Sequence, residues 1–229
     1  MAAHTKIIDL FGIPACGKTT LASYMNKKQF NGLLYASAKE AHHEMKQSSI
    51  FKIAKCFNCR SIISAIRFVS YFPYTKKRRD LPILKWLRDS VFRSFYRKFS
   101  KYDVVLIDHG AVQTFVSWER GEDFHNDSEF QRRVLNYLNN IESTVFVFCD
   151  VDNETSIKRI RQRGRDHGRL DMILESDEGS IQSELDAERI RFQKLAELIK
   201  ENGHKVIIID SNGNIDDIAI ELADKISEI

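Results

Sequence analysis

The stretch Lys6-Ile-Ile-Asp-Leu-Phe-Gly-Ile-Pro-Ala-Cys-Gly-Lys-Thr19 decides the fold. Its first six residues are mostly apolar without alternation, which is typical of a strand buried on both faces of a parallel sheet. The next eight, from Gly12 to Thr19, match the pattern GxxxxGK[ST], and a helical pattern runs from Thr19 to Lys28. A strand, this glycine-containing loop and a helix, in that order, predict a phosphate-binding loop.

The residues of this loop have predicted roles in holding a nucleoside triphosphate. Glycines let backbone N–H groups turn inward around phosphate, and the helix N-terminus adds a partial positive charge. Lys18 is predicted to reach the β- and γ-phosphates, and Thr19 to place its hydroxyl on Mg²⁺. The predicted nucleotide contacts in this loop are Gly12, Pro14, Ala15, Cys16, Gly17, Lys18, Thr19 and Thr20.

Further strand and helix patterns alternate along the chain and predict an α/β fold with right-handed crossovers. Helical patterns cover Ser180–Glu201 and Ile215–Ile229. The other strand-like runs are Leu33–Ser37, Asp103–Asp108, Ser143–Asp150 and Lys205–Asp210. With 229 residues, of which 43% are hydrophobic and 29% charged, the chain is predicted to fold as one domain over residues 1–229.

A carboxylate, Asp108, follows the apolar run Val104–Ile107. Ligands of open α/β sheets bind beyond the carboxyl ends of the strands, so Asp108 is predicted to lie near the triphosphate. It could hold Mg²⁺ or take the proton from an attacking hydroxyl, and the sequence leaves both roles open. The structural alternative is that Asp108 forms a turn, which is common for Asp after a strand.

An arginine-rich segment, predicted as a lid over residues 158–170, follows the fourth strand. Arg159 and Arg163 lie four residues apart and would share one helix face. Gly164 and Gly168 follow, as suits a closing lid whose guanidinium groups neutralise charge on a transferred phosphoryl group. The alternative is a solvated basic face.

The charge of the chain is unevenly distributed. The net charge is +3, but residues 46–101 contain 15 Lys/Arg and 2 Asp/Glu. This segment belongs to a predicted helical insertion over residues 38–101, which favours an anionic partner. Within it, Pro82–Phe99 is predicted to be a helix with Leu84, Leu87, Val91, Phe95 and Phe99 on one face and Lys85, Arg88, Asp89, Arg93 and Arg97 elsewhere.

Location and redox state follow from what the sequence lacks. There is no signal-peptide pattern and no apolar run near the roughly 18 residues of a membrane span, so we expect a cytoplasmic protein. Cys56 and Cys59 have CxxC spacing, but no second pair completes a zinc site. We therefore expect two reduced thiols in an apolar helix.

These segments together resemble the P-loop kinases of the nucleoside-monophosphate-kinase group, closest to the thymidylate-kinase and deoxynucleoside-kinase branch. The resemblance rests on Phe11–Thr20, Val105–Asp108, Phe148–Asp152 and Arg159–Arg165. It implies a three-layer fold with a five-stranded parallel sheet, the loop strand being central, and phosphoryl transfer from ATP with Mg²⁺. Thymidylate kinases usually carry Arg after the residue matching Asp108, whereas this chain has His109 and Gly110.

The same resemblance implies roles for individual residues. Lys18 would stabilise the β–γ bridge of ATP, while Thr19 and Asp108 would hold Mg²⁺. Arg159 and Arg163 would act from the lid, with Arg163 also contacting the nucleotide. The loop Ser211–Asn214, which includes Asn212, would lie against adenine.

The leading hypothesis is a kinase that transfers the γ-phosphoryl group of ATP to a small acceptor, which we expect to be anionic. The candidates are a nucleotide, a nucleoside and a phosphorylated sugar. The main alternative is a P-loop ATPase that acts at nucleic acid or an anionic membrane surface through residues 46–101. A GTPase-like switch would need an Asn-Lys-x-Asp motif. The chain has only Asn26-Lys27, in the first helix and without the Asp.

Overall fold

The computed structural model describes residues 5–56, 63, 66, 82–119, 128–141, 145–162 and 178–229. All five predicted strands form, and two of them have the predicted bounds. In chain order the elements are β1 (Lys6–Phe11), α1 (Lys18–Met25), β2 (Gln29–Phe30), β3 (Leu33–Ser37), α2 (Ala38–Lys46), α3 (Ile50–Ala54), α5 (Pro82–Phe99), β4 (Val104–Ile107), α6 (Ala111–Glu119), α7 (Ser128–Leu138), β5 (Val145–Asp150), α8 (Asn153–Gln162), α10 (Glu178–Glu201), β6 (Val206–Asp210) and α11 (Ile215–Ser227).

The sheet has six strands in the order β2-β3-β4-β1-β5-β6, so β1 lies between β4 and β5. The expected five-stranded parallel sheet was wrong in one detail, because β2 adds a short antiparallel edge strand to β3. Asn31 and Gly32 join the two strands with positive φ angles of 50° and 77°. An Asn-Gly pair between apolar runs is a strong hairpin signal, so the sequence did contain the information for this strand.

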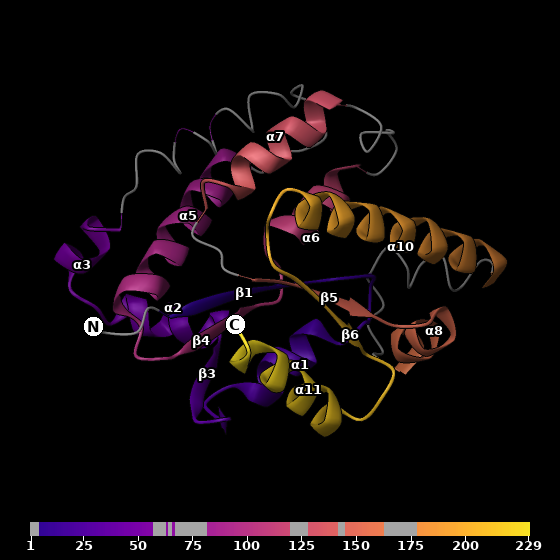
Figure 1. The fold of residues 1–229 in the computed structure, drawn as a ribbon, viewed down its shortest axis with the longest axis horizontal. Coiled ribbons are helices and arrows are strands. Elements are labelled where there is room, and N and C mark those ends of the chain that lie inside the picture. The colour runs from indigo at the N-terminus through magenta and orange to yellow at the C-terminus, as the bar shows by residue number, and fades with distance from the viewer. Residues whose placement is uncertain are drawn as a thin grey trace.

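Helices cover both faces of the sheet (Figure 1). Helices α1 and α11 pack together on one face, and α5, α6 and α10 lie on the other. Alternate residues of β1 therefore meet different layers. Ile8 and Leu10 point to one side, while Ile7, Asp9 and Phe11 point to the other, where the ring of Phe11 lies 6.0 Å from that of Phe192 of α10.

The predicted insertion is helical in its described parts, which are α2, α3 and α5. Helix α5 has the predicted bounds, and Val91 and Phe95 are buried as the apolar pattern predicts. Arg93, which the pattern places off this apolar face, is nevertheless completely buried. The insertion also contains four consecutive basic residues at positions 76–79, and these lie outside the described residues.

Two expectations from composition concern membranes and metals. In the described part of the chain, no helix has the length and apolar character needed to cross a membrane. Cys56 is buried, and its thiol donates a hydrogen bond to the Lys52 carbonyl at 3.1 Å. Cys59 lies outside the described ranges. Within those ranges, no cluster of three or more metal-ligating side chains occurs.

Candidate functional site

The loop between β1 and α1 has a conformation that its sequence constrains closely. Gly12 approaches the neighbouring strand so closely that a Cβ atom there would lie 2.5 Å from the Cys149 carbonyl oxygen. Ala15 and Gly17 have φ angles of 59° and 93°, in the left-handed region that turns the chain. Gly17 is also the residue that precedes α1, so the loop ends at a helix N-terminus. This is the predicted arrangement for a phosphate-binding loop.

Lys18 folds back into the loop. Its side chain is largely buried, and Nζ donates hydrogen bonds to the carbonyl oxygens of Gly12 at 3.0 Å and Ile13 at 3.2 Å. Nζ also lies 3.0 Å from Cys16 Sγ. None of these contacts, taken from the described residues, is to a carboxylate. The ammonium group is therefore held in place without a carboxylate partner among the described residues.

Thr19 and Asp108 meet as the sequence predicts. Thr19 Oγ1 donates a hydrogen bond to Asp108 Oδ2 at 2.7 Å. The contact joins the start of α1 to the end of β4, and β4 pairs with β1 in parallel register. His109 is exposed, with Nε2 4.0 Å from the same carboxylate oxygen. Hydroxyl and carboxylate oxygens are the hard donors that Mg²⁺ prefers, so this pair fits a magnesium site.

Two further side chains support the loop, and the sequence interpretation missed both. Gln113 of α6 accepts a hydrogen bond from the Gly12 N–H through Oε1 at 3.2 Å. Ser156 of α8 donates to the Pro14 carbonyl at 2.7 Å. The apolar spacing of Val112, Phe115 and Val116 could have indicated α6, but not that Gln113 would reach the loop.

Arg159 bridges two loops of the site. Its Nη2 donates to the Ser211 carbonyl at 2.8 Å, and its Nη1 to the Ala15 carbonyl at 3.4 Å. The guanidinium thus ties the phosphate-binding loop to the loop after β6. The described part of α8 ends at Gln162, so Arg163 and the rest of the predicted lid lie outside the described residues.

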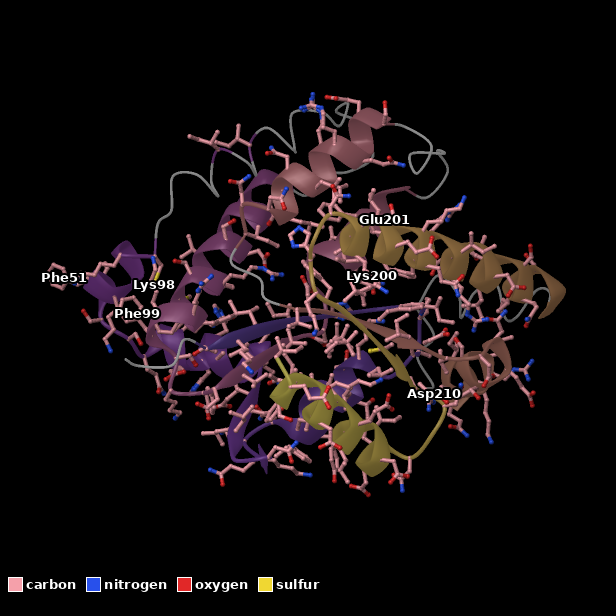
Figure 2. All side chains as sticks on the ribbon, in the orientation of Figure 1. Phe51, Lys98, Phe99, Lys200, Glu201 and Asp210 are labelled. Carbon is pink, nitrogen blue, oxygen red and sulfur yellow. The ribbon has the colours of Figure 1, made fainter. Side chains whose placement is uncertain are left out.

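The loop after β6 is fixed by its polar side chains. Asn212 accepts a hydrogen bond from the Asp152 N–H through Oδ1 at 3.0 Å. The backbone N–H of Asn212 donates to Asp210 Oδ1 at 2.9 Å. Asp210, which is labelled in Figure 2, is the last residue of β6. Asn212 therefore joins the loops after β5 and β6, while its neighbours Ser211 and Gly213 line the cleft.

A cleft of about 980 Å³ brings most of the predicted site residues together. The loop residues Pro14 to Thr20 form one wall, and Asp108 and Arg159 also face it. The other lining residues are Leu21, His109, Gln113, Gln162, Ser211, Gly213, Ile215 and Ile218. Polar groups from the loops after β1 and β4 and from α8 thus meet an apolar patch from α11, as a nucleotide with charged phosphates and an aromatic base would require.

The thiol of Cys16 has an unusual environment within this wall. Burial alone would raise the pKa of Cys16, but a hydrogen bond with Cys149 and the charge of Lys18 outweigh it and lower the pKa to about 6. The pKa of Cys149 is raised, by that hydrogen bond and by burial. The pair therefore favours a thiolate on Cys16 and a protonated thiol on Cys149.

A buried ion-pair cluster lies behind the site, on the α5 side of β1. Arg93 Nη2 donates to Asp9 Oδ2 at 2.9 Å, and Arg93 Nε to Asp89 Oδ2 at 2.7 Å. Asp9 Oδ2 also accepts from the Ala111 N–H at 3.3 Å. A Cβ atom on Gly110 would lie 1.4 Å from Asp9 Oδ1. The cluster thus holds the segment that follows Asp108.

Comparison with known proteins supports the fold. No protein-family model and no curated protein sequence matches the chain. Among solved structures it is similar to deoxyadenosine kinase from M. mycoides with bound dCTP, at a TM-score of 0.51 and 14% identity over 98% of this chain and 100% of that one. The chain shares the α/β fold of that kinase structure. The similarity does not single out the thymidylate-kinase branch.

Weaker similarities are to the same M. mycoides enzyme with bound dATP and to a sugar kinase from Janibacter sp. HTCC2649. The first has a TM-score of 0.44 and 16% identity over 97% of this chain and 100% of that one. The second has a TM-score of 0.43 and 16% identity over 98% and 95%.

Proposed function

We propose that the chain, as a single domain over residues 1–229, is an ATP-dependent kinase. It transfers the γ-phosphoryl group to a small acceptor, which is a nucleotide, a nucleoside or a phosphorylated sugar, and the basic segment 46–101 favours the anionic members of this set. The observation that carries the proposal is that Lys18, Thr19 and Asp108 converge in one cleft at the carboxyl ends of β1 and β4. A kinase needs this combination of a lysine ammonium and hard oxygen ligands around a loop that binds phosphate.

Lys18 is the proposed contact to the β- and γ-phosphates. Its present partners are the neutral carbonyl oxygens of Gly12 and Ile13 and the Cys16 sulfur. Hydrogen bonds to an anionic oxygen are roughly twice as strong as those to neutral acceptors, so a phosphate can displace the carbonyls. The loop N–H groups at the start of α1 would hold the same phosphates.

Thr19 and Asp108 are the proposed ligands of Mg²⁺. When bound there, the ion would supply charge neutralisation on the phosphates of ATP. Asp108 Oδ2 already accepts a hydrogen bond from the Thr19 hydroxyl, with 2.7 Å between the two oxygens. We therefore assign Asp108 to the metal rather than to the acceptor hydroxyl. A loose phosphoryl-transfer transition state needs positioning and charge stabilisation more than a strong base, which agrees with this assignment.

Arg159 and Arg163 have separate proposed roles. Arg159 donates to carbonyls on two loops and would keep the phosphate-binding loop and the loop after β6 in register. Arg163 follows α8 in the predicted lid, and we propose that it reaches the nucleotide and the transferred phosphoryl group. Asn212 holds the loop that we propose lies against the base of ATP.

The direct test replaces the lysine. Lys18→Ala should lower ATP-dependent phosphotransfer by about 10²–10³-fold, the loss typical when one preorganised charge contact to a transition state is deleted. The matched control is Lys39→Ala, because Lys39 is exposed on α2 away from the cleft. Unchanged turnover in the Lys18 variant, with a far-ultraviolet dichroism spectrum like that of the wild type, would refute the kinase proposal.

The acceptor is to be found by screening. ATP consumption and labelled product are measured over nucleosides, nucleoside monophosphates and sugar phosphates, each with the wild type and Lys18→Ala. A product whose formation needs both the acceptor and Lys18 identifies the acceptor class. ATP hydrolysis without any acceptor-dependent product would favour the second candidate.

The second candidate is a P-loop ATPase that acts at an anionic membrane surface or nucleic acid through residues 46–101. It is favoured by Ile50 and Phe51, which are 76% and 77% exposed beside the exposed Lys52 and Lys55. Figure 2 shows Phe51 pointing outward at the edge of the molecule. Binding to anionic vesicles or single-stranded DNA should then fall steeply with salt, and no binding at low ionic strength would exclude this candidate.

A further inference from the structure

Two cysteines flank the first glycine of the phosphate-binding loop, and the proposed phosphoryl transfer uses neither of them. Cys16 lies in the loop and Cys149 in the adjacent strand β5, and both side chains are almost completely buried. A Cβ atom on Gly12 would lie 2.9 Å from Cys16 Sγ and 2.5 Å from the Cys149 carbonyl oxygen. Gly12 is therefore packed between the Cys16 thiol and the backbone of Cys149.

The contacts of Cys16 are those of a nucleophilic thiol. Its Sγ lies 3.0 Å from Lys18 Nζ, and an ammonium at that distance stabilises a thiolate. The Cys149 thiol supplies a hydrogen bond from the other side. Cys16 also lines the cleft, whereas Cys149 lies behind the loop. Cys16 is therefore the nearer of the two thiols to the cleft, although only 2% of the residue is exposed.

We propose that Cys16 is a modification site for hydroperoxides, and that its oxidised form is resolved by Cys149 into a disulfide that weakens nucleotide binding. The first part rests on the thiol pair, on the contact between Cys16 and Lys18, and on the position of Cys16 in the cleft wall. The second part rests on the proposed binding of ATP to this loop.

The chemistry needs a two-electron oxidant, which hydrogen peroxide supplies. The Cys16 thiolate sulfur attacks one peroxide oxygen, the S–O bond forms, the O–O bond breaks, and the leaving hydroxide takes a proton to become water. Cys149 sulfur then attacks the Cys16 sulfur, the S–S bond forms, and the S–O bond breaks with release of a second water that carries the Cys149 proton. In sum, two thiols are oxidised and one peroxide is reduced to two waters.

The disulfide would alter the cradle because the loop has little freedom. The positive φ angles of Ala15 and Gly17 and the close approach of Gly12 to β5 define one conformation. Drawing Cys16 onto Cys149 moves the residue just before Gly17 and removes the sulfur partner of Lys18. We expect nucleotide affinity to fall about tenfold or more, the equivalent of one lost charge-assisted hydrogen bond.

The test uses the full chain treated with hydrogen peroxide and then alkylated with N-ethylmaleimide. Peptide mass spectrometry should find Cys16 linked to Cys149, and ATP affinity should recover with dithiothreitol. Free alkylated thiols at both positions, or a disulfide from Cys16 to a different cysteine, would overturn the proposal. A mapped disulfide with unchanged ATP affinity would overturn its second part. Disulfide mapping needs no ATP binding, so its failure is distinct from failure of the kinase proposal.

Matched variants sharpen the result. Cys56→Ser removes a buried thiol remote from the loop and should still form the disulfide. Cys149→Ser should stop at the sulfenic acid, detected as a dimedone adduct on Cys16. In the unsubstituted chain, saturating ATP should slow alkylation of Cys16, which requires no variant to fold. A Cys149→Ser variant that forms no adduct, together with no protection by ATP, would refute a reactive Cys16.

Discussion

Lys18 and Arg93 both lie against β1, but they have opposite kinds of partner. Lys18 follows the carboxyl end of the strand and contacts two carbonyl oxygens and a sulfur. Arg93 reaches the middle of the strand from α5 and contacts the carboxylates of Asp9 and Asp89. A cation with no carboxylate partner can be transferred to a phosphate, whereas a cation between two carboxylates serves the packing of the fold. Burial alone does not distinguish the two.

Burying the Arg93 cluster costs free energy, and its charged groups shift the pKa of Arg93 and of Asp9. Desolvation would lower the pKa of Arg93, but the carboxylates of Asp89 and Asp9 outweigh it and raise the pKa. Desolvation raises the pKa of Asp9 despite the opposing charge of Arg93. Among the described residues, Asp9 Oδ1 and Arg93 Nη1 have no hydrogen-bond partner. Such a cluster adds little net stability, yet removing its central cation leaves buried charges uncompensated.

The largest expected effect on stability comes from Arg93→Met. It leaves two carboxylates facing an apolar side chain, and we expect the free energy of unfolding to fall by about 3–5 kcal/mol. Lys18→Met is the matched control, because it removes a cation that has no carboxylate partner among the described residues. Urea denaturation measures both. If the Lys18 variant lost as much stability as the Arg93 variant, the distinction between the two cations would be wrong.

The next effect concerns the segment that Asp9 holds. In Gly110→Ala the new Cβ would lie 1.4 Å from Asp9 Oδ1 and 2.3 Å from Cγ, so the carboxylate must move away from the Ala111 N–H. Overpacking of this kind costs about 1–3 kcal/mol, measured by urea denaturation. Gly213→Ala is the control, since its Cβ would meet nothing within 4 Å. Equal stability of the two variants would show that Asp9 moves freely.

The comparison of Lys18 with Arg93 also shows which parts of the fold and the site can be predicted from the sequence. The loop from Gly12 to Thr19 and the carboxylate after β4 were predictable because they depend on local motifs and on the common edge where parallel strands end. The structure brings Thr19 and Asp108 within hydrogen-bonding distance, as that reasoning requires. The glycine at position 110 also has a physical reason, because Asp9 occupies the space that a side chain would need there.

The Arg93 cluster was not predictable in the same way. An aspartate inside an apolar strand is itself a signal, because a buried carboxylate requires a partner. The sequence offers 35 basic residues, however, and the partner lies 84 positions away. Only the packing of α5 on β1 selects Arg93. The supports from Gln113 and Ser156 are similar, because each depends on where a neighbouring helix lies.

The smallest expected effect is that of Asp9→Asn, because Arg93 would keep the carboxylate of Asp89 and Asn could still accept from Ala111. We expect a change within about 1 kcal/mol near neutral pH, well below that of Arg93→Met.

The direction in which the stability of the wild type relative to Asp9→Asn changes with pH is a further test of the Arg93 cluster. The pKa of Asp9 is raised above its ordinary value of 3.8. The stabilisation linked to this shift is fully present below 3.8 and is lost as the pH rises through the raised pKa. Asn does not titrate, so the stability of the wild type relative to Asp9→Asn should decrease with rising pH in that window. Urea denaturation of both proteins between about pH 4 and about pH 7 measures this difference. A relative stability that increased with pH would mean that Arg93 lowers the pKa of Asp9, so that the strand carboxylate gains more from its cation than it loses to burial.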